Sequence, residues 1–304
     1  MRIIERIDEL RSAVRELRSQ AGMKNNQVGF VPTMGYLHRG HVSLLKQAKA
    51  DNGIVVLSIF VNPMQFGPSE DFDRYPRDPE RDLQNAREAG VDIVFMPSVR
   101  EMYPNYPLAL KVTVGEAAER LCGASRPGHF DGVATVVLKL FQIVQPDRAY
   151  FGMKDAQQVA VIKQLVRDFN VPVDIVACPT EREPDGLALS SRNVYLSDAE
   201  RRQAVILSRA LDAASRIMEE GETDAVQLEE SLKRVIDEMP LAVIDYVSVL
   251  SYPSLQPLES GISINKALGK TGDKEIIAAL AVKFGRTRLI DNRIFTISEV
   301  CSYV

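Results

Sequence analysis

Residues 28–61 read VGFVPTMGYLHRGHVSLLKQAKADNGIVVLSIFV, and this stretch decides the predicted fold. A short apolar run ends at Pro32, a helical apolar face follows over 40–50, and 54–61 is apolar without interruption. An apolar run of that length is typical of a parallel strand covered on both faces. The stretch therefore predicts a strand, a helix and a second strand, the unit of a right-handed crossover in a parallel sheet.

The same alternation extends in both directions along the chain. Apolar residues at Ile7, Leu10, Val14 and Leu17 predict an amphipathic opening helix. Further predicted helices cover 79–89, 130–144 and 155–169, and further strands begin at 91, 148 and 171. We expect helix caps at Asp155 and Asp198. Together these elements predict an α/β fold, a Rossmann-like parallel sheet flanked by helices.

Beyond residue 180 the pattern changes. Residues 181–186 (EREPDG) form a polar, turn-rich link before two predicted helices near 199–219 and 224–239. An apolar strand over 244–250 and a second apolar run over 275–284 follow. We therefore predict a Rossmann-like domain over 1–180 and a smaller α+β domain over 181–304, in keeping with about 150 residues per domain.

Composition excludes several classes of protein. With 45% hydrophobic residues among 304, the chain is not a disordered protein. The 37 Lys and Arg nearly balance 41 Asp and Glu, so neither nucleic acid nor a membrane is an expected partner. Cys122, Cys178 and Cys301 lack the spacing of a disulfide framework or a zinc site. Because the opening segment resembles no signal peptide and no apolar run could span a bilayer, we expect a cytoplasmic protein.

The loop after the first predicted strand of residues 28–61 carries His38 and His41 beside Gly35 and Gly40. Histidines three residues apart at a helix start can contact one ligand, and a helix N-terminus attracts anions. Glycines allow a ligand to approach the backbone closely. The loop thus suits a nucleotide phosphate, although a solvated loop or half of a zinc site would present the same residues.

Two other sequence patterns give weaker evidence about function. Residues 268–272 (LGKTG) resemble part of a Walker A loop, but Ile264 stands where its first glycine is required. No GxGxxG follows a predicted strand, which argues against a dinucleotide-binding dehydrogenase. The basic residues of 74–87 are matched by acids, so we interpret that segment as a solvated helix face.

The segment VPTMGYLHRGH over 31–41 resembles the pantoate–β-alanine ligase (pantothenate synthetase) family. This family belongs to the HxGH nucleotidylyltransferase superfamily, which includes the class I aminoacyl-tRNA synthetases. Five more blocks agree in order over nearly the whole chain: SIFVNPMQF (58–66), RPGHF (126–130), FGMKDAQQ (151–158), GLALSSRN (186–193) and RLIDN (288–292).

The resemblance implies a ligation in two steps that consumes ATP with Mg²⁺. The carboxylate of pantoate attacks the α-phosphate, which gives pantoyl adenylate and pyrophosphate. The amine of β-alanine then attacks the acyl carbon, which gives pantothenate and AMP. No protein nucleophile is needed, since such chemistry depends on positioning and charge stabilisation. The family is typically homodimeric, so a second copy is the expected protein partner.

The resemblance also implies a set of site residues. His41, a proton donor in the family, His38, Lys154 and Arg192 are the catalytic candidates. The ATP-binding candidates are Met34, Gly35, Tyr36, Leu37, His38, Arg39, Gly40, His41, Gly152, Met153, Lys154, Asp155, Glu181, Leu189, Ser190, Ser191 and Arg192. Many family members have glutamate where this chain has Met153, which removes one polar contact.

Pantoate and β-alanine have Gln65, Gln158, Asn62 and Arg126 as candidate contacts, and His129 has a supporting role. Simpler roles stay open: Gln65 as a turn-stabilising amide, Gln158 as an exposed helix residue, and the Arg126 segment as an ordinary turn. Asp155 suits a helix cap, a ribose contact or a Mg²⁺ ligand. Ser190–Arg192 resembles the superfamily loop that closes over the triphosphate, but a helix cap and a surface arginine would look the same.

Three rival functions remain. A plain nucleotidyltransferase would stop after one transfer, and the 58–66 and 126–130 blocks argue against it. A binding module without catalysis would not need His38, His41, Lys154 and Arg192 together. A tRNA ligase is disfavoured because the chain has no basic surplus.

Overall fold

The computed structural model describes residues 1–20, 26–67, 72–221 and 224–296, so Cys301 lies outside the described residues. These residues form two compact units. The first comprises 1–118, 126–153 and 161–181, and the second comprises 119–125, 154–160 and the chain from 182 onward. Two short segments ahead of residue 181 thus belong to the second unit, and the continuous domains expected from the sequence stay a prediction. Among the described residues, no helix has the length and hydropathy to cross a membrane.

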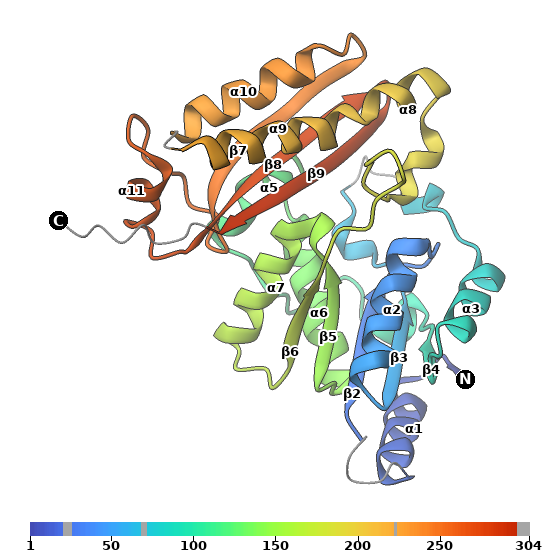
Figure 1. The fold of residues 1–304 in the computed structure, drawn as a ribbon. Helices are drawn as coiled ribbons and strands as arrows, with labels where there is room; N and C mark the ends of the chain where they lie inside the picture. The colour runs from blue at the N-terminus through green and yellow to red at the C-terminus, as the bar shows by residue number, and fades with distance from the viewer. Residues whose placement is uncertain (21–25, 68–71, 222–223, 297–304) are drawn as a thin grey trace. The chain divides into compact units, whose positions relative to one another are not determined.

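A six-stranded sheet forms the centre of the first unit, and all of its pairings are parallel. Its order is β1-β4-β3-β2-β5-β6. The strands are β1 (Arg2–Ile4), β2 (Val28–Thr33), β3 (Ile54–Ile59), β4 (Ile93–Phe95), β5 (Arg148–Gly152) and β6 (Asp174–Cys178) (Figure 1). The Rossmann-like prediction is confirmed. The opening segment adds the short edge strand β1, which the sequence did not predict, ahead of its helix.

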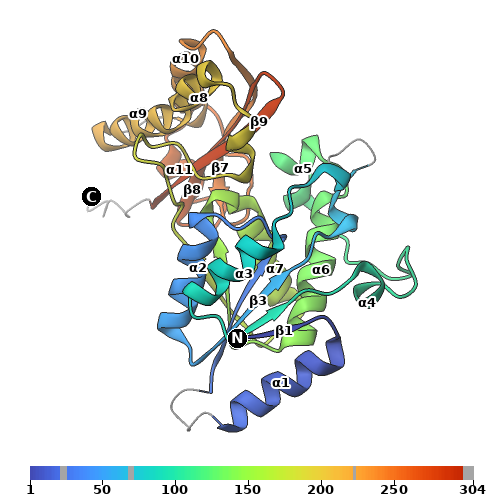
Figure 2. The same cartoon turned by 90° about the vertical axis from the view of Figure 1, so that its right-hand side faces the viewer.

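Helices cover both faces of this sheet. The first unit holds α1 (Ile7–Gln20), α2 (Arg39–Asp51), α3 (Pro79–Glu88), α4 (Val99–Met102) and α6 (His129–Val144). In Figure 2, α2 and α3 lie on one side of the sheet and α1 and α6 on the other. Apolar side chains of α2 and β3, among them Leu45 and Leu57, pack in one buried cluster. The helix α7 (Ala156–Asp168) has its first turns in the second unit and the rest in the first.

The order of the strands sets where a ligand can bind in the first unit. From β2 the chain proceeds through α2 to β3 and β4 on one side, whereas from β5 it proceeds to β6 on the other. The adjacent strands β2 and β5, paired at Phe30 and Ala149, therefore form a topological switch point. Ligands of open α/β sheets bind beyond the carboxyl ends of the strands at such a point. The loops that follow Thr33 and Gly152 both begin there.

The second unit contains an antiparallel sheet of β7 (Ala242–Tyr252), β8 (Glu275–Phe284) and β9 (Thr287–Thr296). Its helices are α5 (Cys122–Ser125), α8 (Asp198–Ala204), α9 (Ile206–Glu220), α10 (Ala225–Asp237) and α11 (Ile264–Leu268). In Figure 1, α9 and α10 lie against one face of this sheet. The α+β prediction is confirmed, but β9, which includes the RLIDN block, was not predicted as a strand.

The predicted cap at Asp198 is wrong by one residue. Ser197 is the N-cap of α8, and Asp198 is the first helical residue. The Ser197 hydroxyl accepts from the N–H of Glu200, and the Glu200 carboxylate accepts from the N–H of Ser197. This is a capping box, whose Ser-x-x-Glu spacing was already visible in the sequence.

Candidate functional site

The loop between β2 and α2 is held from one side by a buried aspartate. Gly35 (φ +85°) and Tyr36 (φ +53°) both adopt left-handed backbone conformations. The resulting turn directs the N–H groups of Tyr36 and Leu37 at the two carboxylate oxygens of Asp82, at 2.7 and 2.6 Å. A Cβ at position 35 would lie 3.0 Å from Asp82 Oδ2 and 2.9 Å from Ile59. Glycine is therefore required there by both backbone conformation and space.

Asp82 is a residue that sequence reasoning missed. The basic residues of 74–87 are exposed, as expected, but Asp82 in the same segment is 1% exposed. Burial raises the pKa of its carboxyl, and the bonds from Leu37 and Tyr36 only partly offset that effect. Asp82 precedes the buried Ala86 by four residues in α3, and this helical spacing was a signal that it faces the core.

The two histidines form the N-terminal cap of α2. His38 is the N-cap residue, and its Nδ1 accepts from the N–H of Gly40 at 3.1 Å. The His38 N–H in turn points at Nδ1 of His41, at 3.4 Å, and the ring centroids lie 4.1 Å apart. A Cβ at position 40 would lie 2.9 Å from the His38 ring, so glycine is what allows the imidazole to fold over the helix end.

This geometry fixes which ring nitrogen carries the proton. Because Nδ1 accepts a hydrogen bond in both His38 and His41, the proton of each neutral ring resides on Nε2. The helix start thus combines the positive end of a helix dipole with two imidazoles, an arrangement suited to an anion. Glu181 lies alongside, with its Cβ 3.8 Å from where a Cβ of Gly40 would be.

The other predicted nucleotide residues of the first unit lie in the loop before α2, at the start of α2 or at the end of β5. Leu37 is 2% exposed and packs in the core, so only its main chain is available to a ligand. Arg39, exposed, is the first residue of α2, and Met34 is half-buried in the loop. Gly152 pairs with Cys178 at the ends of β5 and β6, and Met153 follows it.

A short 3-10 turn over Pro63–Gln65 follows β3 and carries the predicted substrate residues. Asn62 caps this turn, accepting from the N–H of Met64 at 3.2 Å and from the Tyr103 hydroxyl at 2.8 Å. Its amide nitrogen donates to Gln65 Oε1 at 3.2 Å. Gln65 Nε2 lies 3.1 Å from the sulfur of Met34. This contact joins the Pro63–Gln65 turn to the loop between β2 and α2. Asn62 and Gln65 are both buried.

The main chain of Gln65 is held by Arg126 and His129. The Gln65 carbonyl lies 2.8 Å from His129 Nδ1 and 3.3 Å from Arg126 Nη2. Since a carbonyl can only accept, His129 carries its proton on Nδ1. Its Nε2 then accepts from Arg126 Nη1, 3.0 Å away. His129 therefore contacts both the Gln65 main chain and Arg126, which is consistent with a supporting role.

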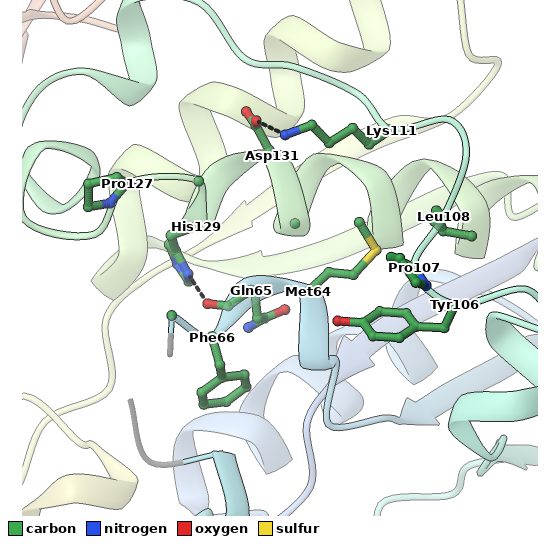
Figure 3. A pocket seen from close by; sticks show the side chains of 13 residues that line it. Met64, Gln65, Phe66, Tyr106, Pro107, Leu108, Lys111, Pro127, His129 and Asp131 are labelled. Atoms are coloured by element: carbon green, nitrogen blue, oxygen red, sulfur yellow. Dashed lines mark hydrogen bonds and ion pairs between the residues drawn. The ribbon is translucent and has the colours of Figure 1, made fainter. Parts of the chain in front are cut away.

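A cavity of about 330 Å³ opens beside this turn. Figure 3 shows the His129 ring pointing at the main chain of Gln65 and Lys111 reaching Asp131 across the opposite wall. Gly132 of α6 also lines it, and a Cβ there would lie 2.3 Å from the Met64 carbonyl oxygen. Glycine at position 132 thus lets α6 pack directly against the turn.

The remaining predicted residues lie in the second unit. The Lys154 side chain is 19% exposed, and its Nζ lies 3.7 Å from the half-exposed carboxylate of Asp155. Gln157 and Gln158 lie in the first turn of α7 and differ in burial. The side chain of Gln157 is buried and bonds the main chain of Arg120 and Cys122, whereas Gln158 is half-buried. Gln157 is thus a structural residue, whereas the assignment of Gln158 to a ligand stays a prediction.

The Leu189–Arg192 segment follows a tight hairpin. Leu189 is buried, whereas Ser190, Ser191 and Arg192 are half-buried. Ser190 caps the 3-10 turn Ser191–Tyr195 by accepting from the N–H of Arg192 at 3.2 Å. The predicted cap of the helix near Asp198 is therefore not made by this segment, since Ser190 caps the 3-10 turn and Ser197 caps α8. Over the residues that the structure describes, no group of three or more His, Cys, Asp or Glu could hold a metal ion.

Comparisons with known proteins agree with the resemblance seen in the sequence. The family model described as pantoate-beta-alanine ligase matches residues 2–294. A pantothenate synthetase of Geobacillus sp. (strain WCH70) is 54% identical over 292 residues, which cover 96% of this chain and 98% of that protein. The crystal structure of pantothenate synthetase from Thermus thermophilus superposes with a TM-score of 0.84 at 45% identity, covering 96% and 99% of the two chains.

A second solved structure carries information on ligands. It is pantoate-beta-alanine ligase from Francisella tularensis, described as complexed with beta-gamma ATP and beta-alanine. It superposes with a TM-score of 0.75 at 38% identity and covers 97% of each chain.

Proposed function

The chain belongs to the pantoate-beta-alanine ligase family, and from that premise we propose that it condenses pantoate with β-alanine in two steps that consume ATP. In the first step a pantoate carboxylate oxygen attacks the α-phosphorus, and the bond to the β-phosphate oxygen breaks. Pantoyl adenylate and pyrophosphate result. In the second step the amine of β-alanine attacks the acyl carbon, AMP leaves, and the amine loses a proton.

The observation that carries this proposal is the start of α2 at the switch point of the sheet. Charge moves onto phosphate oxygens as pyrophosphate leaves, and fixed donors stabilise such charge best when they need no rearrangement. The Nε2–H groups of His38 and His41, at the N-terminus of α2, are donors of this kind. We assign proton donation to the leaving phosphate to His41 and phosphate binding to His38.

The nucleoside part of ATP has its own set of contacts in this proposal. Small or buried residues such as Gly35, Leu37, Gly152 and Leu189 would present main-chain groups to the base and ribose. Glu181 beside Gly40 would do the same, since its Cβ lies close to the helix start. Met34, Tyr36, Arg39 and Met153 would complete the surroundings of the nucleotide.

Pantoate binding is assigned to the Gln65 turn. The amide nitrogen of Gln65 has two hydrogens, one of which faces Met34, so the other can donate to a pantoate hydroxyl or carboxylate. Asn62 and Arg126 hold that glutamine in place from its side chain and its main chain. Gln158 would supply a second amide. Gln65→Ala should therefore raise the KM for pantoate more than the KM for ATP.

The polyphosphate is assigned to Lys154, Ser190, Ser191 and Arg192, and residues 181–304 to the role of a lid domain. A lysine and an arginine bind phosphate oxygens as a point charge and as a fork of donors. Mg²⁺ would enter with ATP, because Mg²⁺ usually takes one or two carboxylates and completes its shell with phosphates and water. The half-exposed Asp155 carboxylate fits that requirement and is the proposed ligand.

The test measures products and partial reactions of the purified protein. Pantoate alone should support exchange of labelled pyrophosphate into ATP, and AMP should accumulate only when β-alanine is added. Formation of ADP and phosphate would indicate an acyl phosphate and overturn the adenylate. Exchange that depends on another acid, or on none, would overturn the substrate assignment and favour plain nucleotidylyl transfer.

We also propose that the protein is a homodimer of the cytoplasm. The segment 108–114 lies against α6, where the N–H groups of Val112 and Val114 bond Thr135 and Asp131 of that helix. The same segment carries Leu110, 87% exposed, which a second copy would cover in the proposed dimer. Light scattering should give twice the chain mass, and Leu110→Asp should reduce it. Cell fractionation tests the location.

A further inference from the structure

Two neighbouring residues of β9, Asp291 and Asn292, are each bonded to a different segment of the second unit that carries proposed phosphate contacts. Successive side chains of a strand point to opposite faces, so the two reach in different directions. Both lie in the RLIDN block, and neither has a role in the function proposed above.

Asp291 holds the hairpin that precedes Ser190–Arg192. Its side chain is 1% exposed, and its two oxygens accept from Nη1 and Nη2 of Arg182 at 2.7 and 2.9 Å. The same guanidinium donates to the Gly186 carbonyl at 3.0 Å. Arg182 also forms an isolated bridge with Ala188. The buried ion pair therefore closes the base of the 182–188 hairpin.

The proposed phosphate residues begin immediately beyond that base. Leu189 follows the bridged Ala188 directly, and Asn193 Nδ2 returns to the Ala188 carbonyl at 3.1 Å. Ser190, Ser191 and Arg192 lie between these two attachments. Their position is thus set by Ala188, and through Arg182 by Asp291.

Asn292 holds the other segment. Its Nδ2 donates to the main-chain carbonyl of Lys154 at 2.9 Å. This bond fixes the backbone from which the Lys154 ammonium extends, one residue before Asp155. Because neighbouring Cα atoms are about 3.8 Å apart, two segments distant in sequence are tied to nearly one point on β9. β9 itself is paired with β8 along its length, which makes that point rigid.

We infer that Asp291 and Asn292 are positioning residues that set the distance between Lys154 and the Ser190–Arg192 segment, so that both bind one polyphosphate. This inference rests on the proposed function. Neither residue touches substrate; each acts through the segment it holds. Loss of either bond should weaken ATP binding and slow adenylate formation, and the capture of the adenylate by β-alanine should change little.

The experiment compares Asn292→Ala and Asp291→Asn with Arg293→Gln in the full-length protein. Arg293 is the next residue of β9, but its guanidinium bonds Asp212 and Ser215 of α9 and holds neither segment. Pantoate-dependent pyrophosphate exchange gives the KM for ATP, and the complete reaction gives the KM for β-alanine. Asn292→Ala should raise the KM for ATP about tenfold, the effect of losing one hydrogen bond of about 1.4 kcal/mol, and leave that for β-alanine within twofold. Arg293→Gln should change neither.

A shared role also predicts that the two variants are not additive. The double variant should raise the KM for ATP by less than the product of the single effects, because either change already disturbs one common spacing. An unchanged KM for ATP in Asn292→Ala, or equal changes in both KM values, would overturn the inference. If Asp291→Asn fails to fold, Asn292→Ala carries the test alone. A wild-type protein without pantoate-dependent exchange would instead overturn the proposed function.

Discussion

The two loops with proposed phosphate contacts are held in contrasting ways. The loop over 33–41 is bonded along its length: Asp82 takes two of its N–H groups, and His38 and His41 cap the helix that follows. The 182–193 segment is held mainly at its base, through Arg182 and Asp291, and beyond it Val194 is 62% exposed. The first loop is therefore held by bonds along its length, whereas Ser190–Arg192 are held between two attachments, at Ala188 and at Asn193.

Each loop also has an aspartate with a shifted pKa, Asp82 against the first and Asp185 within the second, and the two shifts have opposite directions. Burial raises the pKa of Asp82. The pKa of Asp185, in the 182–188 hairpin, is lowered chiefly by its hydrogen bonds from the Arg201 guanidinium. The 33–41 loop is thus held by buried hydrogen bonds to Asp82. The 182–188 hairpin is held by the buried Arg182–Asp291 pair and by the more exposed Asp185–Arg201 pair. Four predictions test this difference.

The largest effect is expected at His41. His41→Ala should lower kcat of pantoate-dependent pyrophosphate exchange by about 10²–10³-fold, the cost of losing one preorganised donor. His38→Asn is the sharper variant, because asparagine is a good N-cap but lacks an Nε2 donor. It should keep the melting temperature and lose activity. An active His38→Asn protein would mean that His38 only caps the helix.

A smaller loss is expected at Asp82. Asp82→Asn leaves one of the Tyr36 and Leu37 N–H groups facing an amide NH₂, which should cost about 1–3 kcal/mol in urea unfolding. Displacement of the histidine loop should also lower kcat, by up to about 10²-fold. Asp78→Asn, which changes the N-cap of the same helix, is the matched control and should preserve kcat. An Asp82→Asn protein with wild-type kcat would remove the argument for a preformed loop.

Arg192 should affect binding without affecting the fold. Loss of charge-assisted hydrogen bonds worth about 1.5–3 kcal/mol in Arg192→Ala should raise the KM for ATP about 10–100-fold. The melting temperature should stay at the wild-type value, because the side chain is only half-buried. Arg202→Ala, an exposed arginine on α8, serves as the control. Equal KM values for the two variants would contradict the assignment.

The smallest effect is expected at Asp185. Asp185→Asn removes a partly exposed ion pair with Arg201 and should cost about 0.2–1 kcal/mol, less at high salt. Because the pKa is lowered on folding, this contribution is present above pH of about 4 and is lost as the pH falls through the folded pKa. The pKa of Asp82 is raised on folding, so the linkage has the opposite sign. The contribution of Asp82 to stability declines as the pH rises through its folded pKa. Denaturation of both variants between pH 3 and 7 checks the two signs.

Most of the fold and part of the site followed from local sequence. The apolar run over 54–61 and the helical face over 40–50 identify their elements without any distant partner. The strands β1 and β9 were missed, because a three-residue strand has too little periodicity and β9 groups its apolar residues in pairs without the alternation of a strand. The anchors Asp82 and Asp291 were missed for another reason: their partners lie 45 and 109 residues away in the chain.

The sequence by itself determined the parallel α/β order, the histidine loop, and the blocks that identify the family. These depend on residues within a few positions of one another, where helix and strand periodicity and backbone conformation apply. Only the tertiary structure decided which polar residues act as anchors: Asp82 on the loop, His129 on Gln65, and Asp291 with Asn292 on two separate segments. A buried polar group must find its partner wherever the fold brings one, and sequence spacing does not contain that information.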